Sequence, residues 1–203
     1  MSGLAVAPAR AAAAAAAEDR ILVVGDSLSA EYGLGRGSGW VAILERRLAQ
    51  EGRRAVVVNA SISGDTTAGG RSRLPALLRE KRPTLVVIEL GANDALRGLP
   101  LDTTKANLAA MARAARAAGA RVVLVGMQLP PNYGRKYGAQ FEGMYGEVAR
   151  EERTALVPFM LKGVADAPNA EALFQPDRIH PVAAAHPTIF ANIWPVLEPS
   201  LAR

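Results

Sequence analysis

Five short apolar runs alternate with five longer segments in which apolar residues recur at helical spacing, and this alternation constrains the fold more than any other feature. The candidate strands are Ile21–Gly25, Ala55–Asn59, Thr84–Leu90, Val122–Gly126 and Ala155–Phe159. The candidate helices are Gly39–Glu51, Thr67–Glu80, Thr103–Ala118, Arg135–Arg153 and Val182–Leu197. Continuous apolar runs are typical of parallel strands that are covered on both faces, and strands separated by helices form βαβ units. The sequence therefore predicts an α/β protein, a three-layer α/β/α sandwich around a five-stranded parallel sheet.

We expect one domain over residues 20–203, preceded by an alanine-rich tail at residues 1–19. The tail has the small residues of a signal-peptide cleavage region, but it lacks a positively charged start and a long apolar core. It is interpreted as an export signal with a misplaced start codon, or as a dispensable tail. The first interpretation predicts a periplasmic or secreted protein, and the second a cytoplasmic one.

Composition excludes several classes of site. The chain has no cysteine, which rules out disulfides, thiolate metal sites and a cysteine nucleophile. Its net charge of +5 comes from scattered arginines without interleaved aromatic residues, so no nucleic-acid partner is expected. No run approaches the roughly 18 apolar residues that span a bilayer, so stable membrane insertion is not expected. The basic surface is compatible with transient contact with anionic lipid, and the oligomeric state stays open.

Polar residues follow the first predicted strand immediately. Ser27 lies two residues beyond Gly25, in the run Gly25-Asp26-Ser27-Leu28-Ser29. Open α/β sheets bind their ligands at the carboxyl ends of their strands, where a serine nucleophile would be useful. Asp and Ser also turn chains and cap helices, so this block by itself favours a turn or cap rather than chemistry.

The next two strands also end in residues suited to stabilising a negative charge. Gly64 follows the second strand, and its backbone N–H can approach an oxyanion because no side chain obstructs it. Asn93 follows the third strand and offers a neutral amide donor, whereas Asp94 is interpreted as a turn or cap residue. The alternative for the Gly64 segment is a loop that ends in a helix N-cap at Asp65 or Thr66.

The last loop contains an aspartate and a histidine three residues apart, Asp177 and His180. At this spacing the carboxylate can hold the imidazole Nδ1–H and leave Nε2 for Ser27. The other histidine, His186, would lie about 240° around a shared helix from His180, so the two are not expected to form a metal pair. His186 is interpreted as a packing residue, and no metal site is predicted.

Together these blocks resemble the SGNH (GDSL-type) hydrolases, and the resemblance runs from about residue 20 to 198. The matching residues of the four blocks are Ser27, Gly64, Asn93 and His180. Two longer segments, Glu89–Gly98 and Leu129–Tyr137, are similar to the bacterial thioesterase I / lysophospholipase L1 / arylesterase branch. The resemblance implies a flavodoxin-like SGNH fold and a serine esterase or thioesterase that hydrolyses acyl-CoA, lysophospholipid and aryl esters.

The resemblance also implies a role for each residue. Ser27 attacks the acyl carbonyl and forms an acyl-enzyme, His180 acts as the base, and Asp177 orients His180. The Ser27 N–H, the Gly64 N–H and the Asn93 amide form the oxyanion hole. No metal or organic cofactor is implied, and the only partner is a small-molecule ester or thioester.

The loop after the fourth strand is expected to contact the acyl chain through Leu129, Pro130 and Tyr133. The alternative is that these side chains complete the core beneath the next helix. Glu31 and Arg178 stand where the branch often has glycine, and both are expected to alter the mouth of the site rather than its chemistry.

Two other functions fit parts of the sequence. A carbohydrate O-acetylesterase would use the same scaffold. The apolar residues expected to contact the acyl chain, Leu129, Pro130 and Tyr133, which we call the acyl wall, argue against it. A non-catalytic nucleotide-binding domain of flavodoxin-like shape would need a phosphate-binding glycine loop after the first strand. The glycine-rich segment 33–39 begins eight residues past Gly25 and lacks the dinucleotide-binding spacing.

Overall fold

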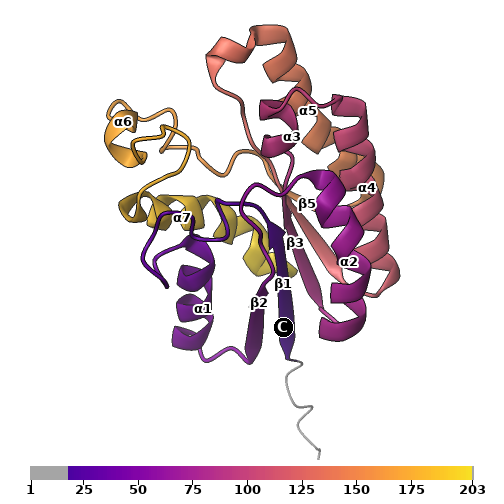
Figure 1. Ribbon diagram of the computed structural model, residues 1–203. Helices are drawn as coiled ribbons and strands as arrows, with labels where there is room; N and C mark the ends of the chain where they lie inside the picture. The colour runs from indigo at the N-terminus through magenta and orange to yellow at the C-terminus, as the bar shows by residue number, and fades with distance from the viewer. Residues whose placement is uncertain (1–17, 203) are drawn as a thin grey trace, which may run out of the picture.

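The computed structural model describes residues 18–202, and its centre is a single sheet of parallel strands (Figure 1). The strands are β1 (Asp19–Gly25), β2 (Ala55–Asn59), β3 (Leu85–Glu89), β4 (Arg121–Val125) and β5 (Ala155–Val157). Their order across the sheet is β2-β1-β3-β4-β5, and every neighbouring pair is parallel. The predicted five-stranded parallel sheet is confirmed, with strand ends that differ by at most two residues.

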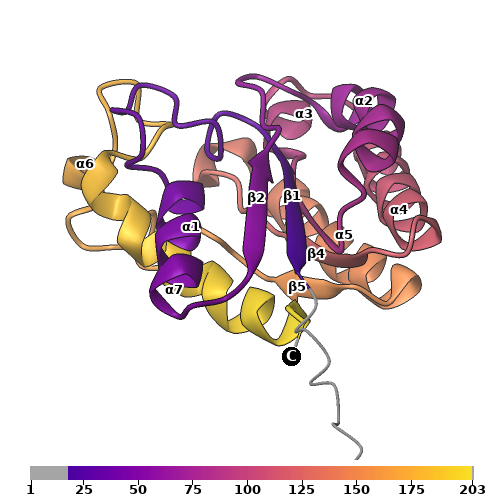
Figure 2. The ribbon, with the colours of Figure 1, turned by 90° about the horizontal axis from the view of Figure 1, so that it is seen from below.

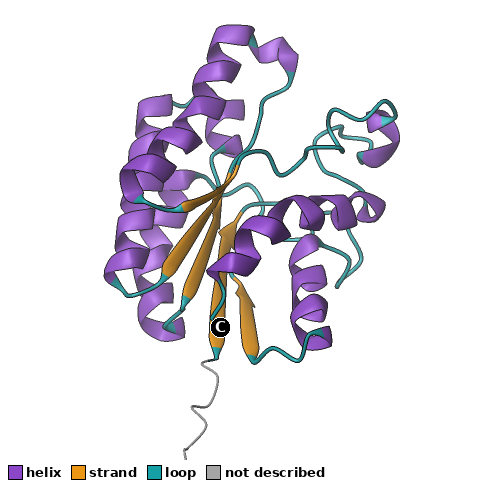
Figure 3. Ribbon diagram, turned by 180° about the vertical axis from the view of Figure 1, so that it is seen from behind, coloured by secondary structure: helices purple, strands orange, loops and turns teal. Residues whose placement is uncertain are grey.

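Helices cover both faces of this sheet. They are α1 (Trp40–Gln50), α2 (Thr67–Lys81), α3 (Ala92–Leu96), α4 (Leu101–Ala117), α5 (Arg135–Glu152), α6 (Ala170–Leu173) and α7 (His186–Leu197). Three short 3₁₀ turns are η1 (Pro131–Tyr133), η2 (Ala183–Ala185) and η3 (Glu198–Ser200). Figures 2 and 3 show α1 and α7 together on one face and α2, α4 and α5 on the other, which confirms the three-layer sandwich.

Two helices were not predicted, because each is too short to show a helical period. α3 has five residues and α6 has four, whereas periodicity needs a window of about eleven. The predicted helix at 182–197 divides into η2 and α7, and Pro187 lies in the first turn of α7, where a missing N–H costs nothing. None of the helices in the described range is long and apolar enough to cross a bilayer.

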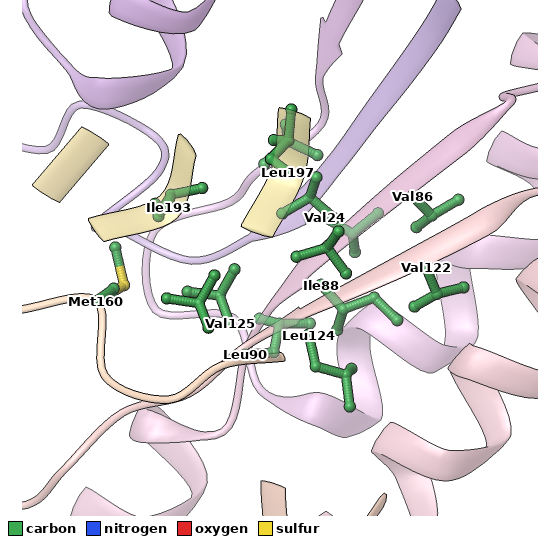
Figure 4. Packing of buried hydrophobic residues seen from close by; sticks show 14 of the residues in the cluster. Val24, Val86, Ile88, Leu90, Val122, Leu124, Val125, Met160, Ile193 and Leu197 are labelled. Carbon is green, nitrogen blue, oxygen red and sulfur yellow. The ribbon is translucent and has the colours of Figure 1, made fainter. Parts of the chain in front are cut away.

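The core lies between the sheet and α7 on one side and between the sheet and α2, α4 and α5 on the other. All five residues of β3 are buried, which explains the continuous apolar run in its sequence. Figure 4 shows Ile193 and Leu197 of α7 beside Val24, Ile88 and Leu124 of the sheet. These contacts anchor the strands whose carboxyl ends carry the polar residues of interest.

The predicted tail falls mostly outside the described residues, but its last residue belongs to the sheet. Asp19 is the first residue of β1, and it is buried. Its carboxylate accepts hydrogen bonds from the Arg121 side chain at 3.0 Å and from the Ala202 backbone at 2.9 Å. These partners lie over 100 residues away in the chain, so local sequence gave no sign that the ordered strand begins before Arg20.

Candidate active site

The strand order reverses between β1 and β3, which are neighbours although β2 lies between them in the chain. The chain leaves β1 toward α1 on one face and leaves β3 toward α3 and α4 on the other (Figure 2). In open α/β sheets the crevice at this switch point is where ligands bind. Ser27 follows β1, Asn93 lies in α3 directly after β3, and the segment between α6 and η2 brings His180 to the same place.

Ser27, His180 and Asp177 form a continuous hydrogen-bonded chain. His180 Nε2 lies 2.9 Å from Ser27 Oγ, and His180 Nδ1 lies 2.7 Å from Asp177 Oδ2. The other Asp177 oxygen accepts the backbone N–H groups of Ile179 and His180, each at 3.0 Å. The bonds from the His180 backbone, the His180 ring and the Ile179 backbone lower the pKa of Asp177 to about 2. Asp177 is therefore a carboxylate at neutral pH.

The His180 ring also has an aromatic neighbour that the sequence did not identify. The Tyr32 ring centroid lies 4.4 Å from that of His180, with the ring planes tilted by 40°. Gln175 connects the two segments, because its side-chain amide donates to the carbonyls of Tyr32 at 2.9 Å and Pro181 at 3.1 Å. Tyr32 and His180 are 148 positions apart in the chain, which explains why no sequence pattern indicated the contact.

Three groups at the carboxyl edge of the sheet are suited to binding an oxyanion. Within residues 18–202, neither the Ser27 N–H nor the Gly64 N–H donates to another group of the chain. Gly64 has a φ of +77°, which glycine adopts without strain, and Arg97 Nη2 donates to its carbonyl at 2.8 Å. Asn93 Nδ2 donates one hydrogen to Asp26 Oδ2 at 2.9 Å, which leaves its second hydrogen available to a substrate.

The Asn93 amide contacts one member of a buried pair of carboxyl groups, Asp26 and Glu89, which the sequence did not indicate. Asp26 and Glu89 are 1% and 2% exposed. Burial raises the pKa of Asp26 to about 6. Burial, and then the charge of Asp26, raise the pKa of Glu89 well above its ordinary value. A glutamate that ends the apolar run Leu85–Ile88 was the available signal, since a charged residue there must find partners.

The expected acyl-binding residues lie on one segment at the end of β4. Leu129 is partly buried against the core, Pro130 is exposed, and Tyr133 is partly buried in η1. This segment leads into α5, whose Tyr137 hydroxyl donates to the Ala95 carbonyl of α3 at 3.3 Å. Figure 1 shows the segment rising beside α3. It therefore borders the helix that carries the Asn93 amide.

Comparisons with known proteins agree with this arrangement. Residues 23–187 match the GDSL-like Lipase/Acylhydrolase family. The chain belongs to this family. "Esterase TesA" of Pseudomonas aeruginosa is 56% identical over 186 residues, which cover 92% of this chain and 91% of that protein. "Thioesterase 1/protease 1/lysophospholipase L1" of Escherichia coli is 41% identical and covers 91% of this chain and 86% of its own length. A crystal structure of TesA superimposes with a TM-score of 0.87 and covers 90% of this chain and 100% of that one.

Membership of the GDSL-like family confirms the predicted fold and the predicted class of enzyme, a hydrolase of ester bonds. The non-catalytic nucleotide-binding alternative is therefore wrong. The structure also gives a physical reason. In the glycine-rich segment, the N–H groups of Gly37 and Gly39 donate to the carboxylate of Glu31 at 3.0 and 2.7 Å, so they are already occupied.

The two departures from the family pattern occupy the same backbone conformation. Glu31 and Arg178 have φ values of 59° and 57°, the left-handed region that favours glycine. Glu31 uses its side chain to hold the glycine-rich segment, whereas the Arg178 guanidinium lies 3.6 Å from Glu171 on the surface. The first substitution therefore has a structural partner at the mouth of the site, and the second has only an exposed one.

His186 and Asp94 both have structural roles. His186 is buried, and its Nδ1 accepts the Trp40 backbone N–H at 3.0 Å, which confirms its interpretation as a packing residue. The angular argument was wrong, because His180 precedes the helix that begins at His186. Burial lowers the pKa of His186 and keeps its ring neutral. Asp94 lies inside α3, and its carboxylate accepts the Thr67 backbone N–H in the first turn of α2 at 2.9 Å. The N-cap of α2 is Thr66, so the expected local turn or cap role of Asp94 was wrong.

Proposed function

We propose that Ser27, His180 and Asp177 form the catalytic triad of a serine esterase and thioesterase. The observation that carries the proposal is the hydrogen-bonded chain from Ser27 Oγ through both nitrogens of His180 to Asp177. Ser27 Oγ attacks the acyl carbonyl while His180 Nε2 takes its proton. His180 then gives the proton to the departing alkoxide or thiolate, which leaves an acyl-enzyme. Water activated by His180 hydrolyses that ester and restores Ser27.

The negative charge of the tetrahedral intermediate needs donors that are already in place. The Ser27 N–H, the Gly64 N–H and the free amide hydrogen of Asn93 supply them in this proposal. Such donors accelerate acyl transfer because they meet the oxyanion without reorganising at the moment of reaction. Asp177 keeps its charge throughout, so it orients the imidazole and stabilises the imidazolium that forms.

The proposed substrates are esters and thioesters with an apolar acyl chain, including acyl-CoA, lysophospholipid and aryl esters. Similarity to a protein named thioesterase 1 and lysophospholipase L1 supports this range. Leu129, Pro130 and Tyr133 would line the acyl chain, since their segment borders the Asn93 helix. We also propose that the alanine-rich tail predicted at residues 1–19, up to the start of β1, is an export-signal remnant and that the protein acts in the periplasm or outside the cell.

A fluorophosphonate probe tests the nucleophile directly. The wild-type protein is expected to take up one equivalent and to lose hydrolysis of p-nitrophenyl esters and acyl-CoA in parallel. Ser27→Ala should take up none. Ser72→Ala is the matched control, because Ser72 is an exposed serine on α2 and should label as the wild type does. Labelling of Ser27→Ala, or a preference for acetylated sugars over medium-chain esters, would contradict the proposal.

A further inference from the structure

Asp26 precedes the proposed nucleophile in the chain, and its side chain is buried. One of its carboxyl oxygens accepts the Leu28 backbone N–H at 3.1 Å, and the other accepts Asn93 Nδ2 at 2.9 Å. Both bonds use Asp26 as an acceptor. The two partners fix it from different elements, because Leu28 follows β1 and Asn93 belongs to α3.

Asp26 is also held by a buried hydrogen-bond network that contains Glu89, Ser29 and Trp40. Glu89 Oε2 accepts the Asp26 backbone N–H at 3.3 Å and the Ser29 hydroxyl at 2.7 Å. Ser29 Oγ in turn accepts Trp40 Nε1 at 3.1 Å. Burial, and then the charge of Asp26, raise the pKa of Glu89. Burial also raises the pKa of Asp26, and the bonds from the Leu28 N–H and the Asn93 amide oppose that rise because they stabilise the charged form. Asp26 is the acceptor in both of these bonds.

The orientation of the Asn93 amide matters because oxygen and nitrogen can exchange places by rotation about its last bond. With Nδ2 toward Asp26, its second hydrogen is available to the oxyanion. With Oδ1 in that place, one oxygen would face the Asp26 carboxylate and the substrate oxyanion together, and both contacts would be repulsive. A carboxylate that only accepts hydrogen bonds therefore selects the productive amide orientation.

We propose that Asp26 is a positioning residue that locks the Asn93 amide with its N–H toward the oxyanion, and that Glu89 supports this lock by accepting the Asp26 backbone N–H. The proposal rests on the proposed function, in which Asn93 is an oxyanion donor. It adds a buried pair to the machinery, and neither of its members touches the substrate.

The lock has a pH dependence set by the groups around Asp26. Glu89 faces it from β3, His180 from the loop after α6, and Tyr145 interacts with it from α5. Arg73 of α2 approaches the neighbouring Gly25 carbonyl at 3.4 Å. Burial raises the pKa of Asp26 to about 6, so below that pH the carboxyl gains a proton. A protonated Asp26 can donate to Oδ1, which releases the amide from its productive orientation.

The test is a double-mutant cycle on Asp26 and Asn93. Asp26→Asn keeps the shape but has one carbonyl oxygen, and if that oxygen keeps the Leu28 N–H, an NH2 group then faces Asn93. We expect kcat for a p-nitrophenyl ester to fall by about 10²-fold, with KM within about threefold. In the Asn93→Ala background the same substitution should lower kcat by less than about threefold, because no amide remains to be positioned.

Asp19→Asn is the matched control, since Asp19 is a buried aspartate at the opposite end of the same strand. It should lower the melting temperature and leave kcat unchanged. Losses that multiply in the double mutant, or a wild-type kcat for Asp26→Asn, would overturn the positioning role. If Asp26→Asn does not fold, the pH dependence of kcat on its acid side tests the proposal instead. Asn93→Ala should remove one titrating group from that acid limb, and an unchanged acid limb would overturn the proposal. Hydrolysis by Ser27→Ala would instead refute the proposed function.

Discussion

Two aspartates at the carboxyl edge of the sheet differ in burial, in partners and in the direction of their pKa shift. Asp26 is 1% exposed, and burial raises its pKa to about 6. The Asp177 side chain is 37% exposed, and hydrogen bonds from His180 and Ile179 lower its pKa to about 2. Desolvation dominates the first case and hydrogen bonding to the charged form dominates the second.

The same difference separates the two halves of the proposed site. Asp26, Glu89 and Asn93 are built on β1, β3 and α3, so the packing of the sheet fixes them. Asp177 and His180 belong to a loop between α6 and η2, where local backbone bonds hold them. The oxyanion side is therefore fixed by the sheet, whereas the acid–base side is held by bonds within its own loop and by contacts with the Tyr32 segment.

The largest expected effect comes from the Ser27–His180 hydrogen bond, which joins the two halves of the proposed site. Ser27→Ala and His180→Ala should each lower kcat by about 10⁴–10⁶, because members of a triad act as a unit. The measurement is kcat for a p-nitrophenyl ester, with the melting temperature as the check on folding. A His180→Ala protein within tenfold of the wild type would show that the loop half is not catalytic.

Asp177→Asn tests the loop half alone. The variant should lower kcat by about 10⁴ at neutral pH, because an amide can stabilise the wrong imidazole tautomer. The wild-type Asp177 pKa of about 2 lies below an ordinary aspartate value of about 3.9. A lowered pKa means that the stability gained from this group is present above about pH 4 and is lost as the pH falls toward 2.

Asp177 should therefore make no contribution to the acid limb of activity between pH 4 and 7. Equilibrium unfolding measured from pH 2 to 7, for the wild type and for Asp177→Asn, checks the sign. The difference in stability between them should be constant above pH 4 and shrink below it. A difference that grows toward low pH would contradict the lowered pKa.

Asn93→Ala tests the buried half, with a smaller expected effect. Loss of one oxyanion donor should lower kcat by about 10²–10³ and change KM little, because the bond is strongest in the transition state. Asn192→Ala is a matched control, since the Asn192 amide donates to the carbonyls of Met160 and Lys162 away from the site. It should lower stability only. An effect of Asn93→Ala confined to KM would make Asn93 a ground-state binding residue.

The two halves of the proposed site also differ in how well the sequence predicts them. Asp177 and His180 are three residues apart, so a pattern in one short segment indicates their contact. The strand ends that carry Ser27, Gly64 and Asn93 follow from the parallel sheet, whose carboxyl ends meet at one edge.

Asp26 and Glu89 could not be paired from the sequence, because 63 residues separate them and each resembles an ordinary turn or strand-end residue. The register of β1 against β3 sets Gly25 opposite Glu89, and this pairing brings the two carboxyl groups together. Strand register depends on the packing of the whole core. Tyr32 and Asp19 were not identified because their partners lie more than 100 positions away in the chain.

A modest effect is expected at the acyl wall, outside both halves. Leu129→Ala should lower kcat/KM for C8 to C12 esters by about tenfold and for acetyl esters by less than twofold, since each buried methylene contributes about 0.8 kcal/mol. The measurement is kcat/KM across a C2 to C12 series. Met127 shares the loop but is 8% exposed and belongs to the core. Met127→Ala should therefore lower the melting temperature and change kcat/KM by the same factor for every ester in the series. If Leu129→Ala also lowers kcat/KM equally for all chain lengths and lowers the melting temperature, Leu129 is a core residue and does not contact the acyl chain.

The smallest effect separates Glu31 and Arg178, which are two of the four non-glycine residues with left-handed backbones in the described range. A left-handed conformation costs an L-residue about 1–2 kcal/mol, and replacement by glycine removes this cost but adds about 0.4–1 kcal/mol of unfolded-state entropy. Arg178→Gly gives up only an exposed ion pair at 3.6 Å, so its melting temperature should stay within about 2 °C of the wild type. Glu31→Gly also loses two bonds from backbone N–H groups to a charged oxygen, which contribute about 1.5–3 kcal/mol each. Its melting temperature should fall by about 4 °C or more, and equal melting temperatures for the two variants would show that the glycine-rich segment does not need the Glu31 carboxylate.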